Sequence, residues 1–97
     1  MPEQVTFPKQ ERWLSSRGLM AFPAHIDRRT WTCLLSEEAL NELFDAGRIG
    51  RFDAFSQNRG EIESVTATKI LTGLFPPGEI RIGRDDFRTA QEFIAWE

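Results

Sequence analysis

Two residue types that build many catalytic and metal sites are scarce in this sequence, which has one cysteine, Cys33, and one histidine, His25, among 97 residues. A single cysteine excludes a disulfide within the chain. One cysteine and one histidine are also too few for an ordinary zinc site built by a single chain. We therefore predict no metal site and no cofactor.

Long hydrophobic runs are missing as well. No apolar run approaches the ~18 to 20 residues that a membrane-spanning helix requires. The first residues, MPEQVTFPKQER, lack the basic flank and apolar core of a secretory signal. We expect a cytoplasmic protein that does not bind membranes.

Positive charge is outnumbered, because 12 Lys and Arg stand against 15 Asp and Glu and give a net charge of −3. Binding to phosphates requires a concentrated positive face, so this balance counts against nucleic acid as the main partner. The 40% hydrophobic and 28% charged residues are typical of a folded globular protein. We expect one domain over residues 1–97, with a core over about 5–87 and a helical extension over 88–97.

The segment from Gly50 to Leu74 is predicted to form one long central helix. At 100° per residue its apolar side chains fall on one stripe, and its polar side chains fall mainly on the other side. No other segment offers as much apolar surface, so the remaining elements are expected to cover this stripe. The stripe contains Phe52, Phe55, Ile62, Thr66 and Ile70, with Ala67 and Leu74 at its margin.

Residues 19–26 and 30–36 are predicted to form a β-hairpin around Asp27-Arg28, with Phe22 opposite Cys33. A two-residue and a four-residue loop give the same pairing, and the longer loop is favoured because Asp-Arg is a poor type I′ sequence. Pro23 cannot donate to a ladder, so its strand is expected at a sheet edge, or bulged there. One face then carries Met20, Phe22, Ala24, Ile26, Trp31, Cys33 and Leu35, and the other carries Leu19, Ala21, Pro23, His25, Thr30, Thr32 and Leu34.

Shorter elements follow on either side of the long helix. A helix is predicted to start at Ser36, whose hydroxyl can cap it, and to end at Gly47. Residues 79–83 alternate and predict another strand, with Ile80 and Ile82 facing inward. A last helix is expected to begin at residues 85–86, with one face formed by Phe87, Ala90 and Ile94.

These elements predict an α+β fold. Its small antiparallel sheet of three or four strands is expected to pack against a long central helix plus one or two shorter helices. Val5 and Phe7 alternate and can add a short edge strand, which Pro8 would end. Trp13 and Leu14 are expected to lie over the core as a flap.

Several short motifs occur along the chain. In order they are Phe7-Pro8, Phe22-Pro23-Ala24, Thr32-Cys33, Ser36 before Ala39-Leu40, Phe55 with Asn58-Arg59 and Ile62, and Ile82 with Asp86-Phe87. Over about residues 5–87, their order and spacing resemble the small bacterial family known as domain of unknown function 1488. Members of that family are single-domain α+β proteins with no established activity. The resemblance therefore implies a fold and a bacterial setting, and it implies no catalytic residue.

No arrangement of residues predicts catalysis. Cys33 and His25 are the nearest to a nucleophile and its base, but the predicted register directs their side chains to opposite faces of the sheet. The acids at 37–38, 61 and 63, and 85–86 are typical of helix starts and of a solvated helix face. The glycines at 47, 50 and 60 lack the spacing of a phosphate-binding loop. We predict no catalytic residue.

Basic residues supply the first candidates for a partner surface. Arg28 and Arg29 lie at the predicted hairpin tip. If Arg48 and Arg51 lay close to them, the four side chains would hold an anion or an acidic partner. The alternative is that they are ordinary solvated arginines.

The other partner candidates are Arg59, Phe93 and Trp96. Arg59 projects among apolar residues, so either its stem packs there with its head reaching Glu63 or water, or it forms a buried ion pair or a partner contact. Phe93 and Trp96 fall off the apolar face of the last helix. They either pack on the flank of their own chain or contact a second copy.

Three functions stay open. The first is a non-enzymatic protein-interaction module that binds a protein partner or self-associates, through the C-terminal helix or the strand that contains Pro23. The second is a small-ligand-binding protein or minor enzyme with a pocket between the sheet and the long helix. The third, nucleic-acid binding, is not expected.

Overall fold

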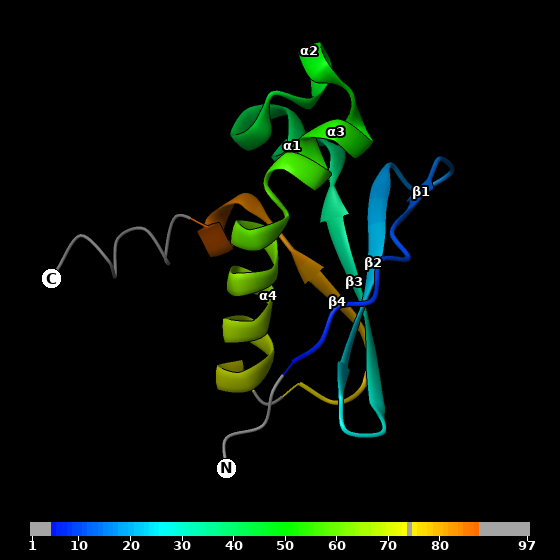
Figure 1. Cartoon of the computed structure of the whole chain (residues 1–97), viewed down its shortest axis with the longest axis vertical. Coiled ribbons are helices and arrows are strands. Elements are labelled where there is room, and N and C mark those ends of the chain that lie inside the picture. The colour runs from blue at the N-terminus through cyan, green and yellow to red at the C-terminus, as the bar shows by residue number, and fades with distance from the viewer. Residues whose placement is uncertain (1–4, 74, 88–97) are drawn as a thin grey trace, which may run out of the picture.

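The computed structural model describes residues 5–73 and 75–87 and shows a four-stranded sheet with helices packed on one face (Figure 1). The strands are β1 (Arg12–Leu14), β2 (Leu19–Ile26), β3 (Arg29–Ser36) and β4 (Gly78–Ile82), and the helices are α1 (Glu37–Phe44), α2 (Ala46–Ile49), α3 (Arg51–Gln57) and α4 (Arg59–Gly73). Residues 84–87 are also helical. The predicted α+β class is confirmed. Within the described residues, no helix is both long enough and apolar enough to cross a membrane.

The β2–β3 hairpin has the predicted register. Phe22 lies opposite Cys33, and the pairing continues to Ile26 opposite Arg29. The longer loop favoured from the sequence is wrong, because only Asp27-Arg28 connects the two strands. Asp27 accepts a φ of 55°, a left-handed conformation that aspartate tolerates better than most residues, and this makes the short turn workable.

The sheet is mixed, so the expectation of an antiparallel sheet is wrong at one strand. β4 runs parallel to β3, with Trp31 opposite Gly78 and Leu35 opposite Ile82. The reason is the connection: helices α1 to α4 carry the chain from the end of β3 back to its beginning, so β4 enters from the same end. Ile80 and Ile82 face inward as predicted and are 4% and 1% exposed.

The predicted long helix is divided at Asn58 into α3 and α4. Asn58 has φ −116° and ψ 18°, and its side-chain Nδ2 donates to the carbonyl of Ala54 at 2.9 Å. This bond stabilises a non-helical backbone between the two helices. The predicted stripe is correct for α4, where Ile62, Thr66 and Ile70 are buried. It is wrong for Phe52, which is 49% exposed, because α3 turns Ala54 and Phe55 toward the core instead.

Helix α1 begins as predicted and ends earlier than predicted. The Ser36 hydroxyl accepts a hydrogen bond of 3.1 Å from the Ala39 N–H. The helix stops at Asp45, which has a φ of 59°, and not at Gly47. Asp45 can take the left-handed conformation that ends a helix, so the glycine is not needed for this purpose.

The two faces of the sheet bury two separate apolar clusters. The larger cluster lies between the sheet and the helices and includes the whole predicted inward face of the hairpin. The smaller cluster lies on the other face and contains Leu19, Ala21 and Leu34, with Leu14 packed against it. Leu14 belongs to β1, so the expected flap of Trp13 and Leu14 is in fact a strand of the sheet.

Candidate interaction surface

The segment before β1, residues 5–11, lies along β2 and is called the strap here. Thr6 and His25 exchange backbone hydrogen bonds of 2.9 and 2.8 Å, and further along Arg12 pairs with Ala21. Between these points the strap has residues 7–11, whereas β2 has only residues 22–24, so the strap bulges away. The bulge lies opposite Pro23, which has no N–H to offer. β2 is therefore an inner strand and not the expected edge, but its ladder is bulged at the proline as predicted.

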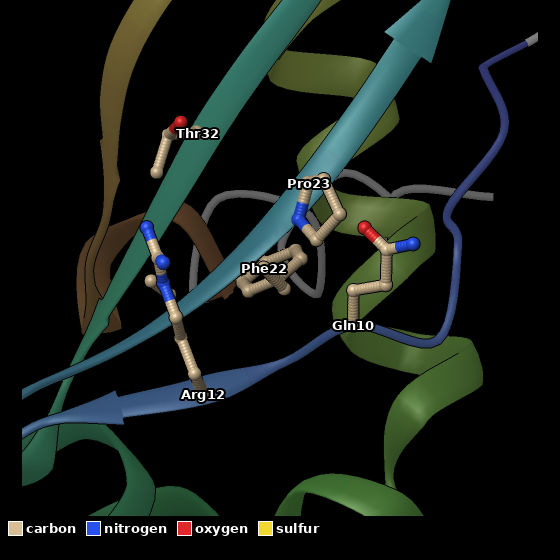
Figure 2. Close-up of a pocket in the computed structure, with 6 residues that line it drawn as sticks. Gln10, Arg12, Phe22, Pro23 and Thr32 are labelled. Carbon is tan, nitrogen blue, oxygen red and sulfur yellow. The ribbon is translucent and has the colours of Figure 1, made fainter.

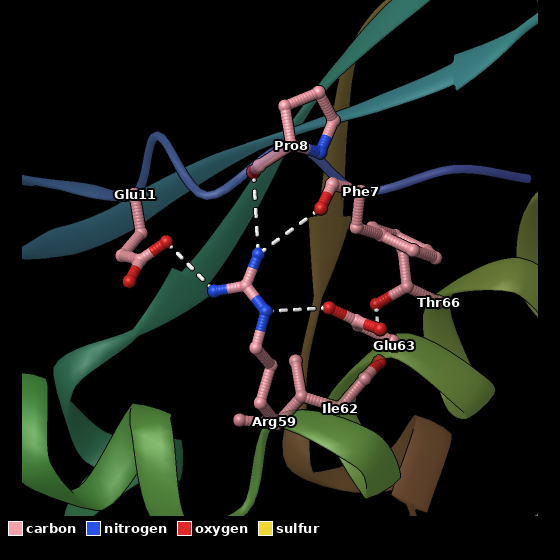
Figure 3. Close-up of polar contacts among 7 residues, drawn as sticks. All are labelled: Phe7, Pro8, Glu11, Arg59, Ile62, Glu63 and Thr66. Carbon is pink, nitrogen blue, oxygen red and sulfur yellow. Dashed lines mark hydrogen bonds and ion pairs between the residues drawn. The ribbon is translucent and has the colours of Figure 1, made fainter.

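Arg59, at the start of α4, holds the strap from the helix side (Figure 3). Its Nη1 donates to Glu11 Oε1 at 2.7 Å, and its Nη2 donates to the carbonyls of Phe7 and Pro8 at 3.3 and 3.2 Å. Its Nε lies 2.6 Å from Glu63 Oε2. All three guanidinium nitrogens thus have acceptors. We call this arrangement the Arg59 clasp.

The electrostatic interactions within the clasp favour the ionised forms of Arg59 and Glu11. Burial alone would lower the pKa of Arg59, but the hydrogen bonds and charges of Glu11 and Glu63 outweigh burial and raise its pKa. Burial alone would raise the pKa of Glu11, but the hydrogen bond and charge of Arg59 help to lower that pKa below its ordinary value of 4.5. Arg59 therefore has the ion pair with Glu63 that the sequence suggested, and its donors are already used within the chain.

Cys33 and His25 lie on opposite faces of the sheet, as the register predicted. The Cys33 side chain is fully buried in the larger cluster, and burial raises the pKa of its thiol to about 12. A thiol in this setting is neither ionised nor accessible near neutral pH. Within residues 5–73 and 75–87, no group of three or more histidine, cysteine or acidic side chains is placed to hold a metal ion.

The sheet face away from the helices is called the free face here. Arg12 on β1 and Arg81 on β4 have their side chains on this face, because their neighbours Trp13, Ile80 and Ile82 pack into the larger cluster on the helix side. No described helix covers the free face (Figure 1). Its apolar centre is the smaller cluster of Leu14, Leu19, Ala21 and Leu34.

An exposed ion pair crosses the free face. Arg17, in the turn between β1 and β2, places Nη1 at 3.0 Å from Oε2 of Glu79 on β4, so the pair spans β3. The two side chains are 38% and 57% exposed. The smaller cluster thus lies beneath long charged side chains rather than beneath a helix.

A hollow of about 280 Å³ opens beside the bulge (Figure 2). The Arg12 side chain extends from β1 toward Thr32, while Gln10 and Pro23 lie on the other side of the hollow. The bulge of the strap creates this space, because a regular ladder would have brought β1 and the strap alongside β2 without interruption. The lining residues are Gln10, Arg12, Ala21, Phe22, Pro23 and Thr32.

The other predicted arginines do not form one site. Arg28 and Arg29 lie at the hairpin tip, at the opposite end of the sheet from α2 and α3 (Figure 1). Arg51 stacks on the Trp13 ring at 4.0 Å and pairs with Glu37. The four-arginine anion site considered from the sequence is therefore wrong. Phe93 and Trp96 lie outside the described residues.

Sequence reasoning did not select Arg12, Arg17 and Arg81, the basic residues of the free face. A signal was present, because the hairpin register already placed Leu19, Ala21 and Leu34 on a second face. Apolar residues on both faces of a strand indicate that both faces are covered or contacted. The arginines that border this face belong to β1, a short turn and β4, and only the tertiary structure brings them together.

Comparison with known proteins identifies a family and a fold. The model of the family described as "Protein of unknown function (DUF1488)" matches residues 5–82. A crystal structure of a DUF1488 family protein of unknown function from Shewanella loihica PV-4 is similar, with a TM-score of 0.71 and 20% sequence identity over 84% of this chain and 94% of that chain. No curated protein matches the sequence. The likeness supports the fold and assigns no activity.

Proposed function

The chain belongs to the DUF1488 family, and from this premise we propose that it is a non-enzymatic, cytoplasmic protein-interaction module. Its free face binds the partner. The observation that supports this most directly is the smaller apolar cluster on a sheet face that no described helix covers. Leu19, Ala21 and Leu34 are only 1 to 5% exposed, because side chains of this chain already cover them. A partner protein therefore reaches the cluster by displacing the long charged side chains above it and taking their place as the second layer.

The charges of the free face indicate what the partner surface contains. Arg12, Arg17 and Arg81 face one acid, Glu79, in a chain whose net charge is −3. The interaction face is therefore more positive than the rest of the molecule. We infer a partner with apolar side chains at its centre and carboxylates around them, because complementary charge steers association and fixes orientation.

Site-specific photo-crosslinking tests this proposal. A photoreactive residue is placed at Thr32 on the free face in one variant and at Ser64 on the exposed side of α4 in another. Each variant is expressed in the native host and irradiated in cells. A partner protein is expected to crosslink through position 32 and not through position 64.

Charge reversal then identifies the basis of the contact. Replacing both Arg12 and Arg81 by glutamate is expected to abolish the crosslink at position 32, because like charges would then face the partner. Arg48→Glu with Arg51→Glu, which makes the same two charge reversals on α2 and α3, is the matched control. Crosslinking that is equal at positions 32 and 64, or that the double reversal leaves unchanged, contradicts the proposal.

A second function, binding of a small ligand, is supported by the hollow beside the bulge. Its expected place between the sheet and the long helix does not suit it, because Ile62, Thr66 and Ile70 of α4 fill that side and are 0 to 3% exposed. The hollow on the free face instead offers the Arg12 guanidinium and the Thr32 hydroxyl. A thermal-shift screen of small carboxylates and phosphates, repeated on Arg12→Ala, tests this alternative.

A further inference from the structure

The strand β4 is an edge strand of the sheet. The order of the strands is β1, β2, β3, β4, so among the described residues β4 has one paired side and one open side. Lys69 Nζ, from α4, donates to the Arg81 carbonyl at 2.7 Å. The register decides which backbone groups of β4 are free: the Glu37 N–H bonds the Gly18 carbonyl, so by alternation Leu34 faces β4. Leu34 has Arg81 as its parallel partner and therefore bonds the residues on either side of it, Ile80 and Ile82, so the Arg81 carbonyl faces the open side. Alternate residues share a side, so the N–H and C=O groups of Glu79 face the open side as well.

We propose that β4 pairs in antiparallel fashion with β4 of a second copy of this chain, with the twofold axis at Ile80. Glu79 then lies opposite Arg81 of the second copy, and Arg81 lies opposite Glu79 of the second copy. Each pair exchanges two backbone hydrogen bonds, and both side chains of each pair lie on the free face. The result is a continuous sheet of eight strands.

The charge pattern of β4 selects this arrangement. A parallel pairing in register would place Glu79 against Glu79 and Arg81 against Arg81, and like charges directly opposite each other destabilise a sheet. A shift by one residue would turn inward side chains outward. The antiparallel pairing about Ile80 is the one that sets an acid against a base at both positions. Such self-complementarity is what a twofold interface requires.

Existing contacts of these residues are compatible with the pairing. A carboxylate accepts several hydrogen bonds, so Glu79 can bind Arg17 of its own chain and Arg81 of the second copy together. The Arg81 carbonyl has two lone pairs, and Lys69 uses one. Phe75, which precedes β4 and is 39% exposed, provides an apolar side chain beside the same edge. A lysine at an edge limits pairing, so a reversible dimer is expected rather than a permanent one.

This pairing goes beyond the proposed function, because it uses the edge of β4 and names a second copy as the partner. It also extends the free face across the twofold axis, which doubles the surface available to the partner protein. The tests need only the purified chain. Because Arg81→Glu also weakens this pairing, loss of the crosslink at position 32 is assigned to the free face only when Arg12→Glu alone, which leaves β4 unchanged, lowers that crosslink as well.

The first test is a charge exchange measured by sedimentation equilibrium. The unmodified chain is expected to dimerise reversibly below about 1 mM. Glu79→Arg alone, or Arg81→Glu alone, sets like charges opposite each other twice and is expected to weaken the dimer about ten- to thirtyfold. The double variant with both changes restores opposite charges and the affinity. Arg17→Ala removes the intrachain pair and should leave the dimer intact.

The second test reads the register directly. Opposed residues of a bonded antiparallel pair have Cα atoms about 5.5 Å apart, within the range of a disulfide. Glu79→Cys and Arg81→Cys are prepared separately. Mixed under oxidation they are expected to give a crosslinked dimer, whereas each alone gives none because its two thiols are diagonal. The native Cys33 is fully buried and is not expected to form a disulfide in this experiment. A chain that is monomeric at about 1 mM, a double variant without recovery, or equal crosslinking of a single variant overturns the pairing.

Discussion

Replacement of Arg59 by methionine is the most direct test of the Arg59 clasp. Methionine keeps an apolar stem beside the Phe55 ring, over which the guanidinium now lies at 5.4 Å. It removes the donors that bind Glu11, Glu63 and the strap carbonyls. Both carboxylates then lose their counter-ion in a largely buried place, and two backbone carbonyls lose a donor.

The expected loss is about 3 kcal/mol of unfolding free energy. Removal of one partner from a buried ion pair usually destabilises a protein by about 3–5 kcal/mol. The side chains of Arg59, Glu11 and Glu63 keep 16, 18 and 29% of their exposure, so water screens them in part and the lower end of this range applies. For a domain of this size, such a loss lowers the melting temperature by more than about 10 °C.

Urea unfolding followed by tryptophan fluorescence measures the loss, and trypsin cleavage at Lys9 reports release of the strap. The control is Arg48→Met, which breaks an ion pair with Asp45 whose arginine is 74% exposed, and no measurable change is expected. Arg59→Lys keeps the positive charge but not the forked geometry of the guanidinium, so its loss of unfolding free energy should lie between those of Arg48→Met and Arg59→Met. If the unfolding free energy of Arg59→Met lies within about 0.5 kcal/mol of that of the unmodified chain and cleavage at Lys9 is unchanged, the Arg59 clasp does not stabilise the fold.

Three further predictions concern acid, the thiol and a glycine. Folding lowers the pKa of Glu11, so the ion pair of Glu11 with Arg59 stabilises the fold fully above pH 4.5, and this stabilisation is lost as the pH falls through the lower pKa of the folded state. When the free energy of unfolding in urea is measured against pH, Glu11→Gln should reduce its fall on the acid side of pH 4.5. Cys33, with a pKa raised to about 12, should react with a thiol reagent at pH 8 only at the rate of unfolding, and prompt labelling of the native chain would contradict its burial. Gly60→Ala should stabilise the chain by up to about 1 kcal/mol in the same urea assay, since a Cβ there meets nothing within 4 Å, and a loss of stability would show that the site is crowded.

The parts of the fold that depend on local chemistry were predictable from the sequence. The hairpin register follows from the two-residue period of its side chains and from the position of Asp27-Arg28. The start of α1 follows from the Ser36 cap, and the buried stripe of α4 follows from the helical period. Each of these features is decided within about ten residues, where the sequence carries the information directly.

The parts that failed depend on contacts the sequence does not display. The break at Asn58 arises from one side-chain bond to Ala54, whereas the apolar period continues across it. The alternation of β4 predicts a strand but not its direction, which is decided by the helices that return the chain. The clasp was only half predictable: Glu63 is four residues from Arg59, whereas Glu11 is 48 residues away.

The two faces of the sheet differ in what covers them, and this difference is the physical basis for placing function on the free face. On the helix side, a large cluster is closed by α1, α3 and α4 and secured by the Arg59 clasp, so a partner would have to disrupt the core to enter. On the free face, Leu34 and its neighbours lie beneath the exposed pair of Arg17 and Glu79. An exposed ion pair contributes little to stability and exchanges its partners readily. A partner carboxylate can therefore replace Glu79 on Arg17 at little cost, and the partner's apolar side chains then take the place of the displaced side chains over the cluster, whose residues are 1 to 5% exposed in the chain alone.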